Sequence, residues 1–439
     1  MNPTQSYKNR SPPANTKRTS RFRPTTIHLL ENDILCIIFS FLDFFDLVRC
    51  SVVCTSWNAL IKNSKLLQLL YLKQHQLESN GINNGELEET ISGFIEELAM
   101  KHHKEALVEP DFVYIDKWKG HSLGLFSIRI DQCRMKMGLL LTGVGDKVIR
   151  MWSIESYKCV EEYSIPNAFS LADFDFDESK IVGLIGTRLC LWRRNGKTST
   201  FLLHEGTHTK GLCMRYSDPE AVIGCDDGTA HVFDMYSKKC SNIIRMHNEP
   251  VTCLALGDDQ LILGGSSLGR ITVSDYSCDQ IATLKPTDSL GIKTLCFDPR
   301  TYQVFAGTAG GYASCWDLRM MRRLWQTRVS PNVIYSLQHL STDKSTLVAG
   351  GIDGVLRILD RNNGDVLTSY IIDQDAASSS SGYAHGAIER RIGVKLLSET
   401  DIDQIPRSFR PSITCLAVGM KKVVTTHNSN YIRVWKFKK

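Results

Sequence analysis

The sequence lacks the motifs that mark most enzymes and metal-binding domains. Its 14 cysteines include no Cys-x-x-Cys pair, and no cysteine–histidine cluster has the spacing of a zinc site. It contains no GxSxG, HExxH or P-loop motif. The acid pairs at 226–227 and 258–259 fall at expected turns, where aspartate usually shapes the turn. We therefore expect no catalytic residue, no bound metal and no cofactor.

Long apolar runs and a secretory leader are also absent. The longest apolar run, Ile34 to Leu42, has nine residues and includes a serine, which is too short to span a membrane. The polar, basic N-terminus has no apolar core segment, so the pattern predicts no secretory signal. We expect reduced thiols in a cytoplasmic or nuclear protein that does not bind membranes.

Acidic residues are missing from the first 25 positions, which hold six lysines and arginines. Because the whole chain has a net charge of +5, the remaining residues are almost neutral. This balance excludes a broad nucleic-acid surface, so no specific nucleic acid is expected as a partner. Residues 1–25 are rich in Pro, Ser, Asn and Arg, which predicts a disordered basic tail. A nuclear-import signal is the alternative reading of that tail.

Residues 26–75 are rich in apolar side chains that recur at steps of three and four, with breaks near 43–46 and 54–56. This periodicity predicts several short helices, and Asp46 is placed to cap a helix that begins at Leu47. A segment of only about fifty residues cannot bury so much apolar surface alone. The pattern therefore predicts packing on a partner.

The order of these residues resembles the F-box family, although Glu31 stands where the family usually has proline. The resemblance implies a small all-α bundle that binds the Skp-type adaptor of cullin-based ubiquitin ligases. The alternative is a plain three-helix domain that packs on its own chain. Asp46 and Cys54 also match the family pattern. The adaptor-binding residues that the resemblance implies are Leu30, Asp33, Ile34, Leu35, Ile38, Leu42, Leu47, Val53 and Trp57.

Residues 76–110 begin with a polar stretch and continue as an amphipathic pattern from about Glu86 to Val108. One face of this pattern carries Ile91, Phe94 and Leu98, and most of the glutamates lie elsewhere. The segment predicts a helical linker between the F-box-like region and residues 111–439.

Residues 111–439 contain an internal repeat. Seven positions align at intervals of 40 to 43 residues and a last interval of 76, and six of them have glycine nine residues earlier. A glycine inside a strand marks a close approach of the backbone. The aligned positions are Trp152, Trp192, Phe233, Ser274, Trp316, Leu359 and Trp435, and the glycines are Gly143, Gly183, Gly224, Gly265, Gly307 and Gly350.

This period, together with Trp316–Asp317 and Gly120–His121, resembles the WD-repeat family, whose fold is an all-β propeller of four-stranded blades. In that family His121 would join a structural network with Asp146; His208 and His247 are looser equivalents. We expect seven blades, with a loop inserted at about 374–410; eight blades are the alternative. The last unit lacks an outer strand, which Phe112–Trp118 can supply to close the ring.

Members of this family that bind phosphorylated clients place arginines at two positions per blade on one face. Of the fourteen residues aligned with those positions only Lys293 is basic, which argues against that mode of recognition. We expect an unmodified peptide or protein surface to be bound by Phe126, Lys293, Ile334 and Ile352. The alternative is that the three apolar residues only line the channel mouth.

Together the two resemblances imply a multidomain protein, with the F-box bundle binding an adaptor and, through it, a cullin. The propeller would hold a client protein for ubiquitination, so the chain itself would not be an enzyme. A protein-interaction scaffold without ubiquitin transfer is the alternative. An enzyme with a propeller active site would need clustered acids or histidines, and the two rings supply only Asp226.

Overall fold

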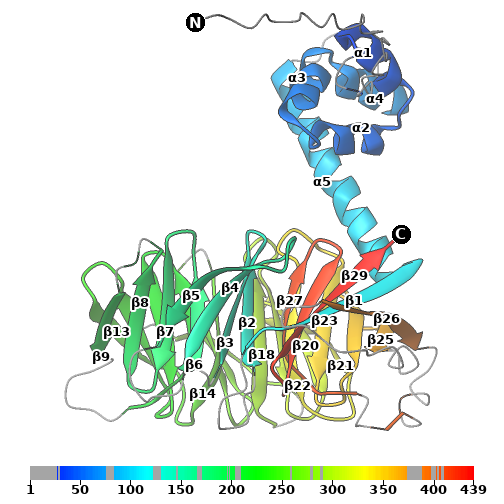
Figure 1. Ribbon diagram of the computed structural model, residues 1–439. Coiled ribbons are helices and arrows are strands. Elements are labelled where there is room, and N and C mark those ends of the chain that lie inside the picture. The colour runs from blue at the N-terminus through cyan, green and yellow to red at the C-terminus, as the bar shows by residue number, and fades with distance from the viewer. Residues whose placement is uncertain are drawn as a thin grey trace, which may run out of the picture. The chain divides into compact units, whose positions relative to one another are not determined.

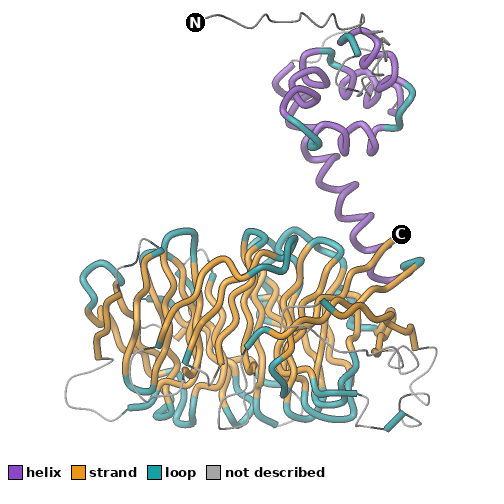
Figure 2. Tube along the Cα trace, in the orientation of Figure 1, coloured by secondary structure: helices purple, strands orange, loops and turns teal. Residues whose placement is uncertain are grey.

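The computed structural model describes residues 27, 30–75, 84–121, 130–144, 147–165, 171–194, 196, 198–202, 209–257, 260–276, 280–286, 290–372, 388–396, 402, 405–406 and 410–439. The predicted basic tail, Phe126, Asp146, His208 and most of the 374–410 insertion lie outside these residues. The chain forms two compact units that divide between Ala99 and Met100. The division falls within helix α5 (Asn84–Val108), inside the predicted linker, whose boundaries remain predictions. Figure 2 shows helices in the first unit and strands throughout most of the second.

The first unit is a bundle of α1 (Asn32–Ser40), α2 (Phe44–Ser51), α3 (Thr55–Asn63), α4 (Leu66–His75) and the beginning of α5. Two clusters of apolar side chains fill it. The first is built on Leu35, Phe39, Leu47 and Ile61. The second is built on Phe44, Tyr71, Leu87 and Ile91.

The prediction that Asp46 caps a helix starting at Leu47 is wrong. Helix α2 begins at Phe44, and Asp43 is its N-cap, because the Asp43 carboxylate accepts a hydrogen bond from the Asp46 backbone N–H at 2.7 Å. Asp46 instead lies in the first turn of the helix, where its negative charge interacts favourably with the helix dipole.

The second unit consists of repeated four-stranded antiparallel sheets, or blades, which Figure 1 shows from the side. Contacts between their innermost strands close the blades into a ring. The predicted all-α bundle followed by a seven-bladed propeller is confirmed. Blades 1 to 3 comprise β2 (Ile130–Lys136), β3 (Leu139–Val144), β4 (Val148–Ser153) and β5 (Cys159–Ser164); β6 (Leu171–Phe176), β7 (Lys180–Ile185), β8 (Arg188–Arg193) and β9 (Thr198–Leu202); and β10 (Gly211–Ser217), β11 (Glu220–Cys225), β12 (Thr229–Asp234) and β13 (Lys239–Arg245).

Blades 4 to 6 continue this order, each running from its innermost strand to its outermost strand. They comprise β14 (Val251–Leu256), β15 (Ile262–Ser266), β16 (Ile271–Ser274) and β17 (Gln280–Leu284); β18 (Ile292–Asp298), β19 (Gln303–Thr308), β20 (Tyr312–Asp317) and β21 (Arg322–Arg328); and β22 (Ile334–Gln338), β23 (Thr346–Gly351), β24 (Leu356–Asp360) and β25 (Val366–Ile372).

The seventh blade combines the two ends of the propeller segment. Its inner strands are β27 (Ile413–Gly419), β28 (Lys422–His427) and β29 (Tyr431–Lys438), and β1 (Phe112–Lys119) is added outside β29. The pairing runs from Phe112 opposite Lys438 to Lys119 opposite Tyr431. The prediction that Phe112–Trp118 supplies the missing outer strand is therefore confirmed.

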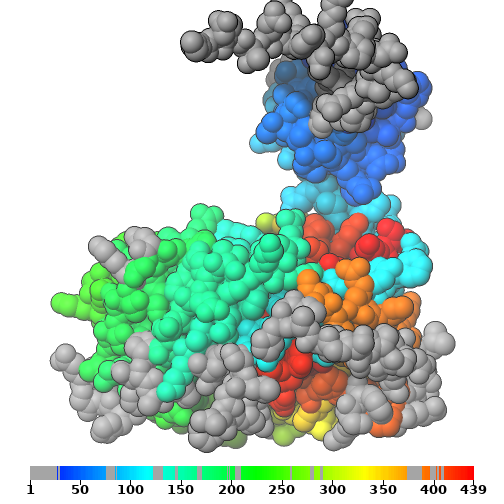
Figure 3. All heavy atoms as spheres, in the orientation of Figure 1, coloured from blue at the N-terminus to red at the C-terminus, as the bar shows by residue number. Residues whose placement is uncertain are grey.

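The prediction that the insertion between blades 6 and 7 is only a loop is wrong. Residues Glu389–Leu396 of this insertion form strand β26, which pairs with β25 on one side and β1 on the other, so that blades 6 and 7 share one nine-stranded sheet. The space-filling view shows the orange β25–β26 region beside β1 (cyan) and β29 (red) (Figure 3). Ile392 and Val394 are exposed, so backbone pairing rather than burial holds this strand. The alternation of apolar residues at 392, 394 and 396 is a strand signal that the sequence analysis missed.

The repeated glycines lie where adjacent blades approach most closely. In five of the six registers, a Cβ added to the glycine would come within 3 Å of the first residue of the next blade's inner strand. At Gly307 that neighbour is Ile334, at 2.9 Å, and at Gly350 it is Ile413, at 2.7 Å. At Gly183 the next inner strand itself begins with glycine, and the Cβ would instead meet Trp192 of the same blade. The repeated glycines are therefore explained by the close approach of adjacent blades.

Blades 1 and 7 each contain a buried chain of tryptophan, threonine and histidine side chains. In blade 1 the Trp152 indole donates to Thr142 Oγ1 at 2.9 Å, and His121 Nε2 lies 3.0 Å from that oxygen. In blade 7 the Trp435 indole donates to Thr425 Oγ1 at 2.9 Å, and His427 Nε2 lies 3.0 Å from it. These chains satisfy the polar atoms of the blade interior.

The His427 ring provides a testable pH dependence. Its Nδ1 lies 3.0 Å from the Pro411 carbonyl oxygen, and burial together with the Arg433 charge holds the pKa well below the ordinary 6.5. The unfolded chain takes up a proton near pH 6.5 and the folded chain does not, so the free energy of unfolding falls as the pH drops below 6.5. We expect this residue to contribute up to about 1.4 kcal/mol per pH unit to that fall.

Urea denaturation between pH 7.5 and 5 measures this contribution. The variant His427→Gln should show a smaller loss of stability per pH unit than the wild type, because glutamine does not titrate. Equal pH slopes for the two proteins would show that His427 takes up its proton equally in both states.

Candidate functional site

The helical unit exposes an apolar surface along α1 and the end of α2. Phe41 is 83% exposed and Val52 is 79% exposed, which is unusual for side chains of this size. The other face of α1 buries Leu35 and Phe39 in the bundle core. We call the exposed set the α1–α2 surface; it comprises Leu30, Ile34, Ile37, Ile38, Phe41, Val52 and Val53.

The structure divides the nine predicted adaptor-binding residues into three groups. Those with exposed side chains are Leu30, Asp33, Ile34, Ile38 and Val53. Leu42 and Trp57 are half-buried against the core, and the Trp57 ring meets the Phe39 ring edge to face at 5.1 Å between centroids. Leu35 and Leu47 lie inside the core, where they support the exposed residues from beneath.

Sequence reasoning missed three members of the α1–α2 surface, Ile37, Phe41 and Val52. The first two continue the steps of three and four residues that connect Leu30, Ile34 and Ile38 along one side of α1. That periodicity could have identified them. Val52 follows α2 as its C-cap and has no equivalent signal.

The second candidate site is the central channel of the propeller. Seven residues at equivalent places line it, each the third residue of an innermost strand. Lys293 and Tyr335, each the second residue of its strand, also line the channel and have exposed side chains. The seven equivalent residues are Gln132, Asp173, Cys213, Cys253, Thr294, Ser336 and Cys415.

Of the three predicted client-binding residues that the structure describes, Lys293 alone is in the channel lining, and Phe126 lies outside the described residues. Ile334 is 1% exposed and belongs to the core between blades 5 and 6, so its prediction as a surface anchor is wrong. The prediction placed the start of this strand at Val333, one residue too early. The exposed residue at the equivalent position is Tyr335. Ile352 is half-buried in the turn after β23, outside the channel lining.

Two buried aspartates of β6 escaped the sequence analysis. Asp173 bonds the Arg134 guanidinium at 2.9 Å and accepts the Met214 backbone N–H at 2.9 Å. Asp175 bonds Lys136 at 2.7 Å and accepts the Tyr216 backbone N–H at 3.1 Å. The positive charges of Lys136 and Arg134 lower the pKa of Asp175 against the effect of burial. These carboxylates join the inner strands of three blades.

The acids considered for catalysis have turn-forming roles where the structure describes them. Asp227 accepts hydrogen bonds from the Thr229 backbone N–H at 3.0 Å and the Thr229 hydroxyl at 2.6 Å. Asp226 accepts the Lys210 backbone N–H at 3.0 Å. The prediction that this pair shapes a turn is confirmed, and the pair at 258–259 lies outside the described residues.

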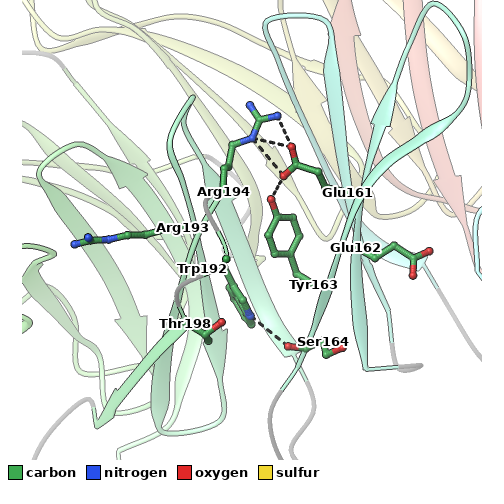
Figure 4. A pocket seen from close by; sticks show the side chains of 9 residues that line it. Glu161, Glu162, Tyr163, Ser164, Trp192, Arg193, Arg194 and Thr198 are labelled. Atoms are coloured by element: carbon green, nitrogen blue, oxygen red, sulfur yellow. Dashed lines mark hydrogen bonds and ion pairs between the residues drawn. The ribbon is translucent and has the colours of Figure 1, made fainter.

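A polar groove lies between blades 1 and 2, where residues of β5 face residues of β8 and β9 (Figure 4). The Arg194 guanidinium bonds Glu161 at 2.5 Å, the Tyr163 hydroxyl donates to the same carboxylate, and the Trp192 indole donates to the Ser164 carbonyl at 3.2 Å. The Arg194 charge lowers the pKa of Glu161. These groups satisfy one another across the blade boundary.

Neither metal binding nor membrane crossing is indicated in the part of the chain that the structure describes. No three His, Cys, Asp or Glu side chains there are grouped as metal ligands would be. None of its helices is long and apolar enough to cross a membrane.

Comparison with known proteins agrees with both halves of this architecture. Residues 27–69 match the F-box domain. An F-box/WD-40 repeat-containing protein of Arabidopsis thaliana is 54% identical over 448 residues, which cover 97% of this chain and 97% of that protein. The chain belongs to the F-box/WD-repeat family.

More distant matches fall on parts of the chain. The target of rapamycin complex subunit LST8 of Rattus norvegicus is 26% identical and covers 56% of this chain and 80% of that protein. Mouse F-box/WD repeat-containing protein 8 is 24% identical over 30% of this chain and 22% of that protein. The crystal structure of the computationally designed protein Ika8 covers 73% of this chain and 98% of its own at 16% identity, with a TM-score of 0.50, which is a likeness of fold alone.

Proposed function

We propose that this F-box/WD-repeat protein is the substrate-recognition subunit of an SCF-type ubiquitin ligase, acting in the cytoplasm or nucleus. The F-box would bind a Skp-type adaptor and, through it, a cullin, and the propeller would bind the client protein. The chain would carry out no chemistry itself. It would act by proximity, because a bound client lysine has a high effective concentration at the ubiquitin-charged enzyme.

The α1–α2 surface is the observation that carries this proposal. It comprises seven exposed apolar side chains within the F-box match, and none of them belongs to the bundle core. A water-exposed apolar surface of this kind is typical of a helical protein–protein interface. Asp33, exposed in the first turn of α1, can supply a polar contact at the margin.

The propeller channel is the client-binding site that the structure favours. Lys293 and Tyr335 are exposed at equivalent places on neighbouring blades and line one cavity with the hydroxyls of Thr252 and Thr414. An aromatic ring beside a cation and hydroxyl groups suits a mixed polar and apolar protein segment. Ile352 stays a proposed contact outside the channel.

Adaptor binding tests the proposal directly. The full-length chain should bind a Skp-type adaptor stoichiometrically, and Ile38→Asp or Val53→Asp should weaken binding at least about 30-fold, the equivalent of about 2 kcal/mol at an interface centre. Both residues are exposed, so the bundle should keep its helical circular dichroism. Titration calorimetry with purified adaptor measures the loss.

Leu324→Asp is the matched control, since Leu324 is a similarly exposed apolar residue on β21 of the propeller. It should bind the adaptor as the wild type does. A folded wild type that fails to bind would overturn the ligase proposal and leave the scaffold as the function. Adaptor binding without ubiquitination of a bound client, in the complete cullin assembly, would also favour the scaffold.

A further inference from the structure

The boundary between the last and first blades brings together two cysteines that are 282 positions apart in the chain. Cys133 is in β2 of blade 1 and Cys415 is in β27 of blade 7, and both belong to the apolar core between these blades. Cys133 is fully buried, whereas Cys415 is 7% exposed and lines the central channel. A small solute in the channel therefore reaches Cys415 first.

The two cysteines lie against each other across this boundary, because Cys415 Sγ is 3.5 Å from the Cys133 carbonyl oxygen and both belong to one cluster. The Thr426 hydroxyl, on the next strand of blade 7, donates to the Cys415 carbonyl oxygen at 3.4 Å.

A guanidinium group contacts the same pair. Arg134 Nη1 lies 3.9 Å from Cys415 Sγ, and Asp173 at 2.9 Å and Gln132 at 3.1 Å hold the rest of the guanidinium in place. A cation beside sulfur favours the thiolate, which is the reactive form of cysteine.

The charged groups around Cys415 act in opposite directions on its pKa. The hydrogen bond from Cys133 and the Arg134 charge lower it to about 6, while burial and the Asp173 charge raise it. Burial and the neighbouring Cys415 raise the pKa of Cys133. The Arg134 guanidinium, which lies beside Cys415 Sγ, therefore favours ionisation of Cys415 over that of Cys133.

Cys213 and Cys253 provide an internal comparison. They occupy the same place in blades 3 and 4 that Cys415 occupies in blade 7. Burial raises the pKa of both, and to about 12 for Cys253. These two cysteines should be unreactive under conditions in which Cys415 reacts.

We propose that Cys133 and Cys415 form a reversible, peroxide-driven cross-link that covalently joins the first and last blades. The Cys415 thiolate attacks one oxygen of hydrogen peroxide, giving a sulfenic acid and hydroxide, which takes up the proton that Cys415 lost. The Cys133 thiol then attacks this sulfur, and water leaves as the disulfide forms. In sum, two thiols and one peroxide give one disulfide and two waters, and a reducing dithiol or glutathione reverses the reaction.

The cross-link would reinforce the place where the ring closes. Strand pairing of β1 with β29 closes the propeller at its outer side, and the disulfide would join blades 7 and 1 at the channel. Oxidation should therefore raise the temperature at which the propeller unfolds, by constraining the unfolded chain.

Mass spectrometry of the full-length protein tests the proposal. After brief treatment with hydrogen peroxide at pH 7, digestion should yield a peptide pair joined through Cys133 and Cys415, and dithiothreitol should release it. The cross-linked protein should have a higher melting temperature. Oxidation of Cys415 to the sulfinic acid without a cross-link, or equal cross-linking of Cys213 to Cys253, would overturn the proposal.

Two kinds of variant complete the test. Cys133→Ser and Cys415→Ser should lose the peroxide-dependent rise in melting temperature, and Cys213→Ser should keep it. Arg134→Gln keeps both thiols, yet should slow cross-linking about tenfold at pH 7 and move the pH midpoint of the reaction above that of the wild type. An unchanged rate and pH midpoint in folded Arg134→Gln would show that the guanidinium does not activate Cys415.

Discussion

Replacing Leu47 by alanine is expected to destabilise the helical unit by roughly 2–5 kcal/mol, the usual cost of a large cavity in a packed core. Leu47 is fully buried between α1 and α3 and shares a cluster with Phe39 and Ile61. Loss of its side chain removes contacts from several helices at once. Because the unit is small, a loss of this size is a large part of its stability. Urea titration followed by far-ultraviolet circular dichroism measures it.

The matched change Leu69→Ala separates this effect from the loss of any leucine. Leu69 lies on α4 and is 59% exposed, so its removal should change stability by no more than about 0.5 kcal/mol. The folded fraction of Leu47→Ala should bind the adaptor as the wild type does, so only its unfolded fraction should lower the measured binding. Equal stability of the two variants would contradict the placement of Leu47 in the core.

The sequence predicts the propeller because each blade repeats one physical requirement. A glycine is needed where the next blade's inner strand approaches, and Gly307 and Gly350 show this spacing directly. Strand β26 is not marked by a glycine of this kind. It is held by backbone pairing, and its Ile392 and Val394 are exposed. A one-residue error in the register of an inner strand exchanges a buried Ile334 for an exposed Tyr335.

The candidate sites are only partly visible in the sequence for a similar reason. The F-box pattern contains apolar residues of both the core and the surface, and only the packed bundle shows that Leu47 is buried and Ile38 is exposed. The channel joins one residue from each of seven strands, so Asp173 and Cys415 meet their neighbours only after the ring has closed. Contacts of this sequence separation have no local signal.

Arg361 is the residue of the propeller whose loss should have the largest effect. It is 1% exposed, and its guanidinium bonds the buried Asp298 carboxylate, the Thr301 hydroxyl at 2.7 Å and the Asp343 carbonyl at 2.8 Å. It also lies 5.0 Å from the centre of the Phe305 ring. The side chain thereby connects blade 5 to blade 6.

Arg361→Met is expected to cost about 3–5 kcal/mol, because it leaves the Asp298 carboxylate buried without its cation. The stability cost of Arg361→Met should be smaller at lower pH. In this variant burial raises the pKa of Asp298 above its value in the unfolded chain, so the free energy of unfolding of the variant falls as the pH rises. Urea denaturation at pH 5 and pH 8, followed by tryptophan fluorescence, measures both effects; one of the tryptophans, Trp325, donates to the Arg361 carbonyl at 2.9 Å. The double variant Asp298→Asn with Arg361→Met should recover part of the stability, and Arg322→Met, at an exposed position of β21, should lose little. A double variant as unstable as the sum of its single changes would show that Asp298 and Arg361 act independently.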